Sequence, residues 1–346
     1  MRIVILGGGF CGAIIAKKLD TCRKLEITLI DQKNYFEYTP SIHKVVSCPS
    51  YLDKITVPYS HFLKNVRVII DNIVHVTPTF VKTEKKKIDF DYLVVSTGID
   101  YPIMLENKEN VFVLKNGNEA AEMSTKLLKA NSIIIIGGGL IGIEIAGELI
   151  TKTKNKKINI VHSHNRLLER NPVKASSHAQ KFLEKHGINI IFNEKVIRHE
   201  DQSFLTDKKR CIEAEVGIWC AGIHFNPWFM KGFNDSILTD KKALKVNQYL
   251  QLTGYNHIFV GGDINNIREE KTAQNAERHA HVIVKNIKRL LKKQSLIKYH
   301  RMNNPLVISL GNRDGIMIVS QFVFKGTLPS KLKRLIEWWI VERIKN

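Results

Sequence analysis

Two glycine-rich turns, each predicted between an apolar strand and a helix, constrain the fold of this 346-residue chain more than any other feature. They read Gly7-Gly8-Gly9-Phe10-Cys11-Gly12 and Gly137-Gly138-Gly139-Leu140-Ile141-Gly142. Both match G-x-G-x-x-G, in which the first glycine permits a tight turn and the second lets the backbone approach a pyrophosphate. The third lets the helix pack closely on the strand. Two copies in matching context predict two dinucleotide-binding sites.

The same order of elements surrounds both turns, and it is typical of parallel sheets. We predict strand, helix and strand over Ile3–Leu6, Cys11–Leu19 and Glu26–Asp31, and again over Ser132–Ile136, Leu140–Ile150 and Lys157–His162. The backbone N–H groups of Phe10, Leu140 and Ile141 lie at the helix starts. We expect them to face the phosphates.

The rest of the chain carries shorter patterns. Between the copies, short strands separated by turn residues are typical of an antiparallel insertion, and they cover Val66–Ile70, Ile73–Val76, Phe80–Lys82 and Ile88–Val95. After residue 240 we predict a strand at Ile258–Val260, a helix near Thr272–Leu291, strands around Leu306–Leu310 and Ile316–Phe324, and a final helix.

A carboxylate is expected at the end of the strand that follows a dinucleotide turn, where it accepts hydrogen bonds from a ribose. Asp31 occupies this position in the first copy, although a solvated aspartate would look the same. The second copy instead runs from His162 to Arg166 without an acid. No carboxylate would then repel a 2′-phosphate, and His162, His164 or Arg166 could contact one, so NADPH is admissible beside NADH. Each histidine could also be a surface residue without a ligand.

Composition narrows the class of protein. With 44% apolar and 25% charged residues, the chain is predicted to fold, and it has no run of about 20 apolar residues that could span a membrane. Its five cysteines form no Cys-x-x-Cys pair, which indicates free thiols, a cytoplasmic location and no metal site. The net charge of +20 indicates attraction to polyanions or anionic lipid, or only a lysine-rich composition.

The two turns, the strand ending in Ser96-Thr97-Gly98 and the segment Phe259-Val260-Gly261-Gly262-Asp263 together resemble the flavoproteins with two dinucleotide-binding domains. The resemblance implies an α/β fold of two Rossmann-like domains, arranged as in glutathione reductase, and a small C-terminal α+β segment. The implied parts are an FAD-binding domain (1–105 and 237–300), an NAD(P)H-binding domain (106–236) and the C-terminal segment (301–346). FAD would be bound tightly but not covalently. It would contact the first turn and also Asp31, Ile73, Thr97, Gly98, Gly262 and Asp263.

Within this superfamily the chain is most similar to type II NADH:quinone oxidoreductases and to the ferroptosis-suppressor and apoptosis-inducing-factor-like quinone reductases. The similarity is carried by segments 34–40, 219–222, 272–277 and 309–315. It implies that NADH or NADPH gives a hydride to flavin N5, followed by two-electron reduction of a membrane quinone without proton pumping.

The resemblance also assigns roles to single residues in these segments. Pro40 would lie beside the isoalloxazine, while Ala221 and Gly222 would close on the nicotinamide. Ala273 and Gln274, at a helix start, would face the flavin and the quinone, where a helix N-terminus stabilises negative charge.

Three further residues are candidates with clear alternatives. Glu144 would orient the nicotinamide, although an exposed glutamate is common at a helix start. His279 and Lys331 are candidates for the quinone side. Type II dehydrogenases have Gln-Gln or Gln-Glu where this chain has Arg278-His279, and this departure affects the quinone-side contacts.

Other functions remain open at this level. Cys48 could serve a single-thiol reductase of the coenzyme A disulfide type, because it follows the segment ending at Pro40. A redox-sensing flavoprotein without catalysis is a second alternative. We expect no nucleic-acid binding, since no aromatic-interleaved basic motif is present.

The C-terminal segment has an amphipathic pattern of its own. From Lys331 to Lys345, apolar residues recur at helical spacing among basic residues, and Trp338-Trp339 suit a headgroup interface. We expect a helix that lies on the membrane surface, which would make the protein peripheral. The alternative is a helix packed on its own domain or on a second subunit of a homodimer.

Overall fold

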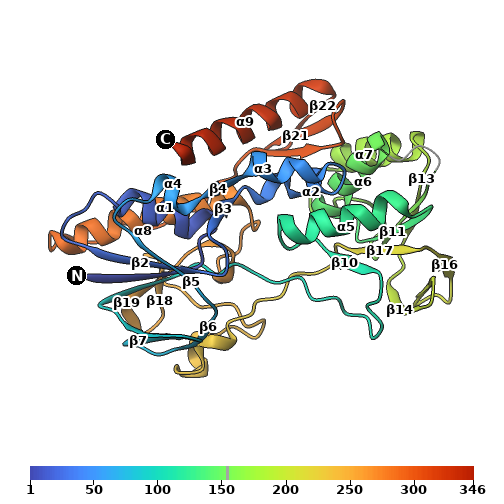
Figure 1. The fold of residues 1–346 in the computed structure, drawn as a ribbon. Helices are drawn as coiled ribbons and strands as arrows, with labels where there is room; N and C mark the ends of the chain where they lie inside the picture. The colour runs from blue at the N-terminus through green and yellow to red at the C-terminus, as the bar shows by residue number, and fades with distance from the viewer. Residues whose placement is uncertain (153–155) are drawn as a thin grey trace.

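Two sheets, built mainly from parallel strands, form the two halves of the molecule in the computed structural model (Figure 1). The structure describes residues 1–152 and 156–346. The first sheet, in spatial order, contains β18 (Gln251–Leu252), β19 (Tyr255–Val260), β9 (Tyr92–Val95), β1 (Arg2–Leu6), β2 (Glu26–Asp31) and β5 (Arg67–Ile70). The second contains β10 (Val111–Val113), β17 (Val216–Trp219), β11 (Ser132–Ile136), β12 (Lys157–His162) and β13 (Ile188–Phe192). The predicted α/β fold is thus confirmed.

Helices accompany both sheets. Those beside the first sheet are α1 (Phe10–Leu19) and α8 (Ala273–Leu291), which pack against each other. Those of the second half are α5 (Gly117–Lys129), α6 (Leu140–Lys152) and α7 (Val173–Lys185). The two glycine-rich turns therefore join β1 to α1 and β11 to α6.

The first sheet is covered on both faces, which explains the unbroken apolar sequence of β1. Ile3 and Ile5 belong to the core shared with α1 and α8. Val4 and Leu6 point to the opposite face, where they pack with a three-stranded sheet of β6 (Ile73–Val76), β7 (Phe80–Thr83) and β8 (Lys87–Asp89). In Figure 1 this small sheet lies beneath the first half, and α1 and α8 lie above it.

The prediction of an antiparallel insertion over residues 66–95 is correct only in its middle. Strands β6, β7 and β8 are antiparallel, but β5 pairs parallel with β2, and β9 pairs parallel with β1. Short apolar runs bounded by turn residues look alike whether the strand is central or peripheral. The sequence pattern therefore could not separate them.

A C-terminal layer covers the junction between the two halves. It consists of β20 (Leu306–Ser309), β21 (Gly315–Val319), β22 (Phe322–Lys325) and α9 (Thr327–Lys345). Helix α9 packs on β20 and β21 and also contacts β4 (Thr56–Pro58) and α4 (Tyr59–Phe62) of the first half. Figure 1 shows α9 running along the top of the molecule, with its C-terminus above α1 and α4.

Two small β elements complete the described structure. Strand β4 pairs with β3 (Tyr35–Glu37), and β14 (Val196–Glu200), β15 (Ser203–Thr206) and β16 (Cys211–Glu213) form an antiparallel sheet. Between β3 and β4 lie α2 (Ile42–Val45) and α3 (Leu52–Ile55). Among the described residues, no helix is both long and apolar enough to cross a bilayer.

Candidate functional site

A cavity of about 1730 Å³ runs from the first glycine-rich turn to the start of α6 and to α9. It brings together most of the residues predicted to hold FAD. Its lining includes Gly7, Gly9, Phe10, Asp31, Pro40, Ile73, Thr97, Gly98, Gly262, Asp263, Ala273 and Gln274. From the second half it includes Leu140, Ile141 and Glu144. The start of α6, which follows the second turn, therefore borders the same space as the first turn.

The first turn has the geometry that a pyrophosphate needs. Gly7 has φ +86°, which L side chains rarely adopt, and a Cβ on Gly12 would lie 1.9 Å from the carbonyl oxygen of Gly7. A Cβ on Gly9 would meet no atom within 4 Å. The backbone beside Gly9 therefore faces open space at the start of α1, where a phosphate would fit.

The second turn repeats this geometry closely. Gly137 has φ +117°, and a Cβ on Gly142 would lie 2.0 Å from the carbonyl oxygen of Gly137. Gly139 faces open space like Gly9. Both turns thus fit a dinucleotide by the same test.

The middle glycine of each turn donates its N–H to the residue at the end of the following strand. Gly8 donates to Asp31, and Gly138 donates to Nδ1 of His162 at 3.1 Å. His162 thus occupies the structural position of Asp31. Because Nδ1 accepts, the proton of the neutral ring is on Nε2. Burial lowers the pKa of His162, which favours this neutral form.

Arg166, suggested as a contact for a 2′-phosphate, is engaged within its own loop in this structure. Its guanidinium donates to the carbonyl oxygens of Leu168, Glu169 and Asn171 and holds the loop after β12 in place. The same loop brings Glu169 to within 3.3 Å of His162 Nε2. A carboxylate therefore lies beside this strand end although the sequence around β12 predicts none.

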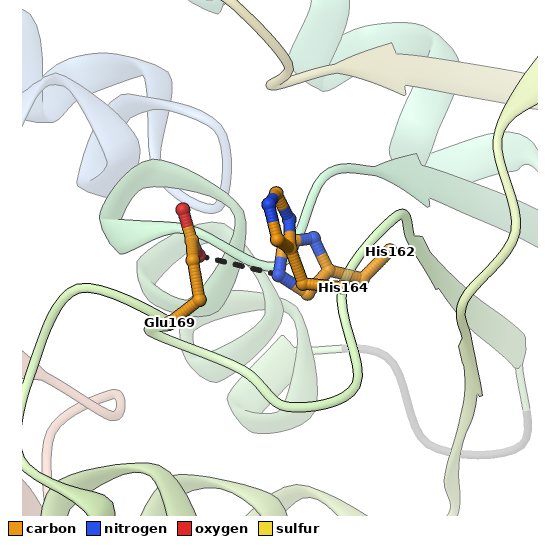
Figure 2. A group of neighbouring side chains, drawn as sticks. All are labelled: His162, His164 and Glu169. Carbon is orange, nitrogen blue, oxygen red and sulfur yellow. Dashed lines mark ion pairs between the residues drawn. The ribbon is translucent and has the colours of Figure 1, made fainter.

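His162, His164 and Glu169 form a compact cluster, and Figure 2 shows their side chains converging. One potential ligand atom from each lies within 4.8 Å of the others. However, the proton on Nε2 of His162 faces Glu169, and a metal would have to displace it while Nδ1 keeps its bond to Gly138. The cluster is therefore better described as a polar contact between His162 and Glu169, with His164 beside it, than as a metal centre.

A similar histidine supports the Gly262–Asp263 turn. Nδ1 of His279 accepts the N–H of Gly262 at 3.1 Å, and Nε2 lies 2.9 Å from Glu269. His279, predicted for the quinone side, is 2% exposed, lies behind the turn and is not among the described residues that line the cavity. It holds the backbone that presents Asp263, whose pKa is raised to about 6 by burial.

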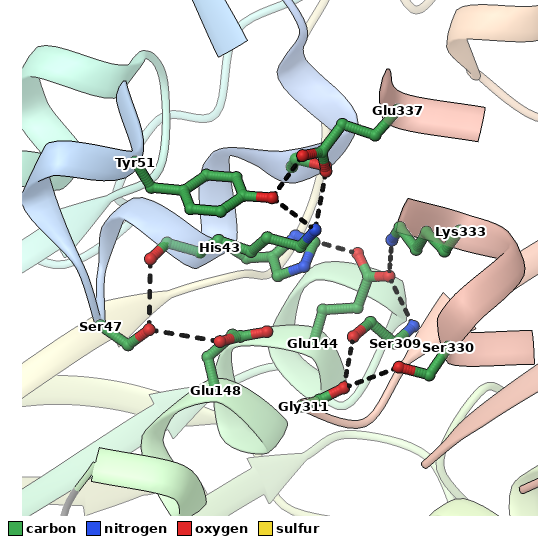
Figure 3. Close-up of polar contacts among 12 residues, drawn as sticks. His43, Ser47, Tyr51, Glu144, Glu148, Ser309, Gly311, Ser330, Lys333 and Glu337 are labelled. Atoms are coloured by element: carbon green, nitrogen blue, oxygen red, sulfur yellow. Dashed lines mark hydrogen bonds and ion pairs between the residues drawn. The ribbon is translucent and has the colours of Figure 1, made fainter. Parts of the chain in front are cut away.

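Glu144 takes part in a buried network at the junction of the halves (Figure 3). Its carboxylate pairs with Lys333 of α9, accepts the N–H of Ser309 at 3.0 Å, and lies 3.5 Å from Nδ1 of His43. Burial, together with Lys333 and Lys44, lowers the pKa of His43 well below its usual value. Glu144 is thus not a solvated helix-start residue; it connects three segments of the chain.

The lysine of α9 that lines the cavity is Lys333, whereas the predicted Lys331 is not among the described lining residues. Lys331 is exposed on α9, whereas Lys333 is buried, lines the cavity and pairs with Glu144. On an α-helix, residues two apart point in different directions, so the lysine-rich sequence could not indicate which one faces inward.

A second ion pair fastens α9 one turn further along. Glu337 accepts from Lys44 at 2.7 Å and from the hydroxyl groups of Ser41 and Tyr51 (Figure 3). Burial, together with the hydrogen bond to Glu337, raises the pKa of Tyr51. Lys333 and Glu337 therefore attach one face of α9 to both halves of the molecule.

The residues expected to close on the nicotinamide lie at the edge of the second half. The carbonyl oxygen of Ala221 accepts Nε1 of Trp219 at 2.7 Å, and Gly222 has φ +76°. Neither is among the described residues that line the cavity, and their contact with a nicotinamide stays a prediction.

Comparison with known proteins agrees with this geometry. Residues 1–280 match the family model described as pyridine nucleotide-disulphide oxidoreductase. The chain belongs to this family.

Relatives across the length of the chain narrow the comparison. It is 31% identical to an apoptosis-inducing factor homolog B of Dictyostelium discoideum, covering 96% of this chain and 92% of the relative. It is 27% identical to ferroptosis suppressor protein 1 of Taeniopygia guttata (91% and 88%) and 25% identical to a type II NADH:quinone oxidoreductase of Staphylococcus aureus (99% and 96%). The resemblance inferred from the sequence is confirmed, and the chain is an oxidoreductase of this family.

A solved structure shows the same fold. NDH2 from Plasmodium falciparum in complex with NADH superimposes with a TM-score of 0.89 at 16% identity and covers 99% of this chain and 97% of that one. The match extends over both halves and the C-terminal layer of this pyridine nucleotide-disulphide oxidoreductase.

Proposed function

We propose that the protein is an FAD-dependent NAD(P)H:quinone oxidoreductase that acts at a membrane surface. The observation that carries the proposal is the cavity shared by the first turn, the start of α6 and α9. The first turn with Asp31 and Asp263 would hold FAD, and the second turn would hold NAD(P)H. Bound FAD would accept a hydride from the nicotinamide and return two electrons to a quinone.

The start of α8 supplies positive potential to this cavity. Thr272 caps the helix by accepting the N–H of Asn275 at 3.3 Å, so the helix begins at Ala273. The first N–H groups of a helix have no partner within it, and the helix dipole places partial positive charge there. Ala273 and Gln274 line the cavity and could stabilise negative charge that develops in it.

Lys333 and Glu144 supply a fixed charge pair on the opposite wall. Both are largely buried, and their mutual pairing holds the lysine ammonium at the cavity surface. In a site shielded from water, such a group can bind a carbonyl oxygen without reorganisation. We propose that Glu144 positions Lys333 and the nicotinamide.

A thiol mechanism has less support from the geometry. Among the described cavity-lining residues, the cysteine is Cys11, at the start of α1, and burial raises the pKa of its thiol. Cys48 lies 3.3 Å from the hydroxyl oxygen of Ser50 and is not among these lining residues. A disulfide reductase needs an accessible thiolate beside the cofactor.

The deciding experiment is steady-state oxidation of NADH and NADPH by the purified flavoprotein with a short-chain quinone as acceptor. We expect turnover, and we expect Cys48→Ser to keep the wild-type rate because its sulfur performs no step. Loss of activity in Cys48→Ser would indicate the coenzyme A disulfide reductase type. Absence of turnover by the wild-type protein would favour a redox sensor.

Helix α9 and strand β22 support membrane attachment. While Lys333, Glu337 and Ile340 face inward, the exposed face of α9 carries large apolar side chains beside the basic residues Lys331 and Arg334. The large exposed apolar side chains of this region are Phe322, Phe324, Leu328, Leu335, Trp338 and Trp339. Exposed tryptophans with neighbouring basic residues suit the interface of an anionic bilayer.

We expect the double variant Trp338→Ser/Trp339→Ser to bind liposomes of anionic phospholipid at least about 10-fold more weakly than the wild type, because it loses most of its insertable aromatic surface. Flotation with the liposomes measures the binding. The double variant keeps the buried ion pairs that Lys333 and Glu337 of α9 make. The control is Val173→Ser, which removes an exposed apolar side chain, 64% accessible, from α7.

The rival occupant of this face is a second copy of the chain. Sedimentation of the wild type and the double variant distinguishes dimer formation from membrane attachment. A wild-type dimer that dissociates in the double variant, with equal liposome binding by both proteins, would contradict membrane attachment.

A further inference from the structure

The loop after β12 returns to the second glycine-rich turn and places Glu169 beside it. The N–H of Leu168 donates to the carbonyl oxygen of Gly138 at 3.0 Å, which pins the loop to the turn. The next residue, Glu169, has Oε2 3.3 Å from Nε2 of His162 (Figure 2). The carboxylate that β12 itself lacks is therefore supplied by a residue seven positions further along the chain.

His162 links this carboxylate to the turn. Its Nδ1 accepts the N–H of Gly138 and its protonated Nε2 faces Glu169, so the imidazole is oriented by both neighbours. In the first turn, Asp31 accepts the equivalent N–H directly. The second turn thus keeps a carboxylate at the ribose end, with an imidazole inserted between the carboxylate and the glycine.

Glu169 is partly exposed to solvent beside the turn. Its side chain is 25% exposed, whereas that of His162 is 7% exposed. A carboxylate at this end of a dinucleotide turn accepts hydrogen bonds from the two hydroxyl groups of the adenosine ribose. The same carboxylate repels a 2′-phosphate, which carries negative charge at neutral pH.

The neighbouring arginine side chains do not cancel the repulsion between this carboxylate and a 2′-phosphate. Arg166 is committed to three backbone carbonyl groups of the loop. Arg170 approaches Glu169 from the outside at 3.6 Å, and its side chain is 73% exposed. Without the carboxylate of Glu169, Arg170 would be free to pair with a 2′-phosphate.

Resting on the proposed function, we propose that Glu169 makes the protein select NADH over NADPH. It accepts hydrogen bonds from the adenosine ribose and excludes the 2′-phosphate. The preference for NADH is thus set by a residue in the loop after β12, and not by the last residue of β12, where the sequence motif has its acid.

The test measures the binding of NAD⁺ and NADP⁺ to the oxidised holoprotein by calorimetry. These oxidised nucleotides stand in for NADH and NADPH because they cannot reduce the flavin. We expect the wild type to favour NAD⁺, and Glu169→Gln to shift the ratio of the two dissociation constants by on the order of 100-fold towards NADP⁺. The control Glu184→Gln removes an exposed carboxylate of α7 in the same half of the molecule and should leave the ratio unchanged.

The possible failures are distinguishable. An unchanged ratio in Glu169→Gln, or a wild type that favours NADP⁺, overturns the role of Glu169 and leaves the proposed oxidoreductase intact. If neither nucleotide binds to a flavin-loaded wild type, the proposed function fails and this inference fails with it. A Glu169→Gln protein with wild-type flavin absorbance and melting temperature excludes misfolding as the cause of any shift.

Discussion

A Gly9→Val protein is expected to fold but to purify with roughly a tenth or less of the wild-type flavin content, because the new side chain fills the phosphate position. A Cβ on Gly9 meets no protein atom within 4 Å, and φ of −71° suits any L residue. The substitution therefore changes the ligand space and leaves the packing of β1 and α1 alone. Flavin absorbance per protein and far-UV circular dichroism measure the two effects separately.

The matched variant is Gly139→Val in the second turn, which also faces open space. We expect this protein to keep its flavin but to lose about 100-fold in kcat/KM for NAD(P)H, since displacing a bound nucleotide by about 1 Å has an effect of this size. Together, the two variants would assign FAD to the first turn and NAD(P)H to the second. Flavin loss in Gly139→Val with flavin retention in Gly9→Val would reverse the assignment.

The second large loss of stability and activity is expected when the ion pair between Glu144 and Lys333 is broken. In Glu144→Gln the lysine stays buried without a counter-ion, and breaking a buried pair in this way costs about 3–5 kcal/mol. We expect the free energy of unfolding to fall by an amount of this order and quinone reductase activity to fall with it. Denaturant titration and steady-state kinetics measure the two losses.

The double variant Glu144→Gln/Lys333→Met separates structure from chemistry. It removes both charges, so most of the lost stability should return, while activity should stay low because neither group remains to bind substrate. If activity returned together with stability, the pair would have only a structural role. Full activity in Glu144→Gln would also contradict our account.

The parallel cores of both halves could be predicted from the sequence because their signals are local. Glycines at fixed spacing after an apolar strand specify the turn, and strands β2, β11 and β12 begin and end at the predicted residues. The segment between Pro40 and Pro58 has no such period. Its short helices α2 and α3 are held by contacts with α5 and α6, which are distant in sequence.

The residues proposed to hold FAD, and Glu144 on the opposite wall, were predicted from motifs and resemblance, whereas the partners of Glu144 were not. His43, Lys333 and Glu337 come from segments far apart in the chain and act through contacts that no spacing records. Glu169 was missed for the same reason, because a loop folds it back to β12. His279 was assigned to the quinone side because Arg278-His279 stands where type II dehydrogenases have Gln-Gln or Gln-Glu, whereas α8 turns its ring towards Gly262.

The central claim is that the two turns serve one redox cavity, and an anaerobic titration of the flavin tests it most directly. Our account predicts that one equivalent of NADH bleaches the flavin absorbance of the purified protein and that a short-chain quinone then restores it. Flavin that stays oxidised under excess NADH and excess NADPH, or reduced flavin that no quinone reoxidises, would contradict the account.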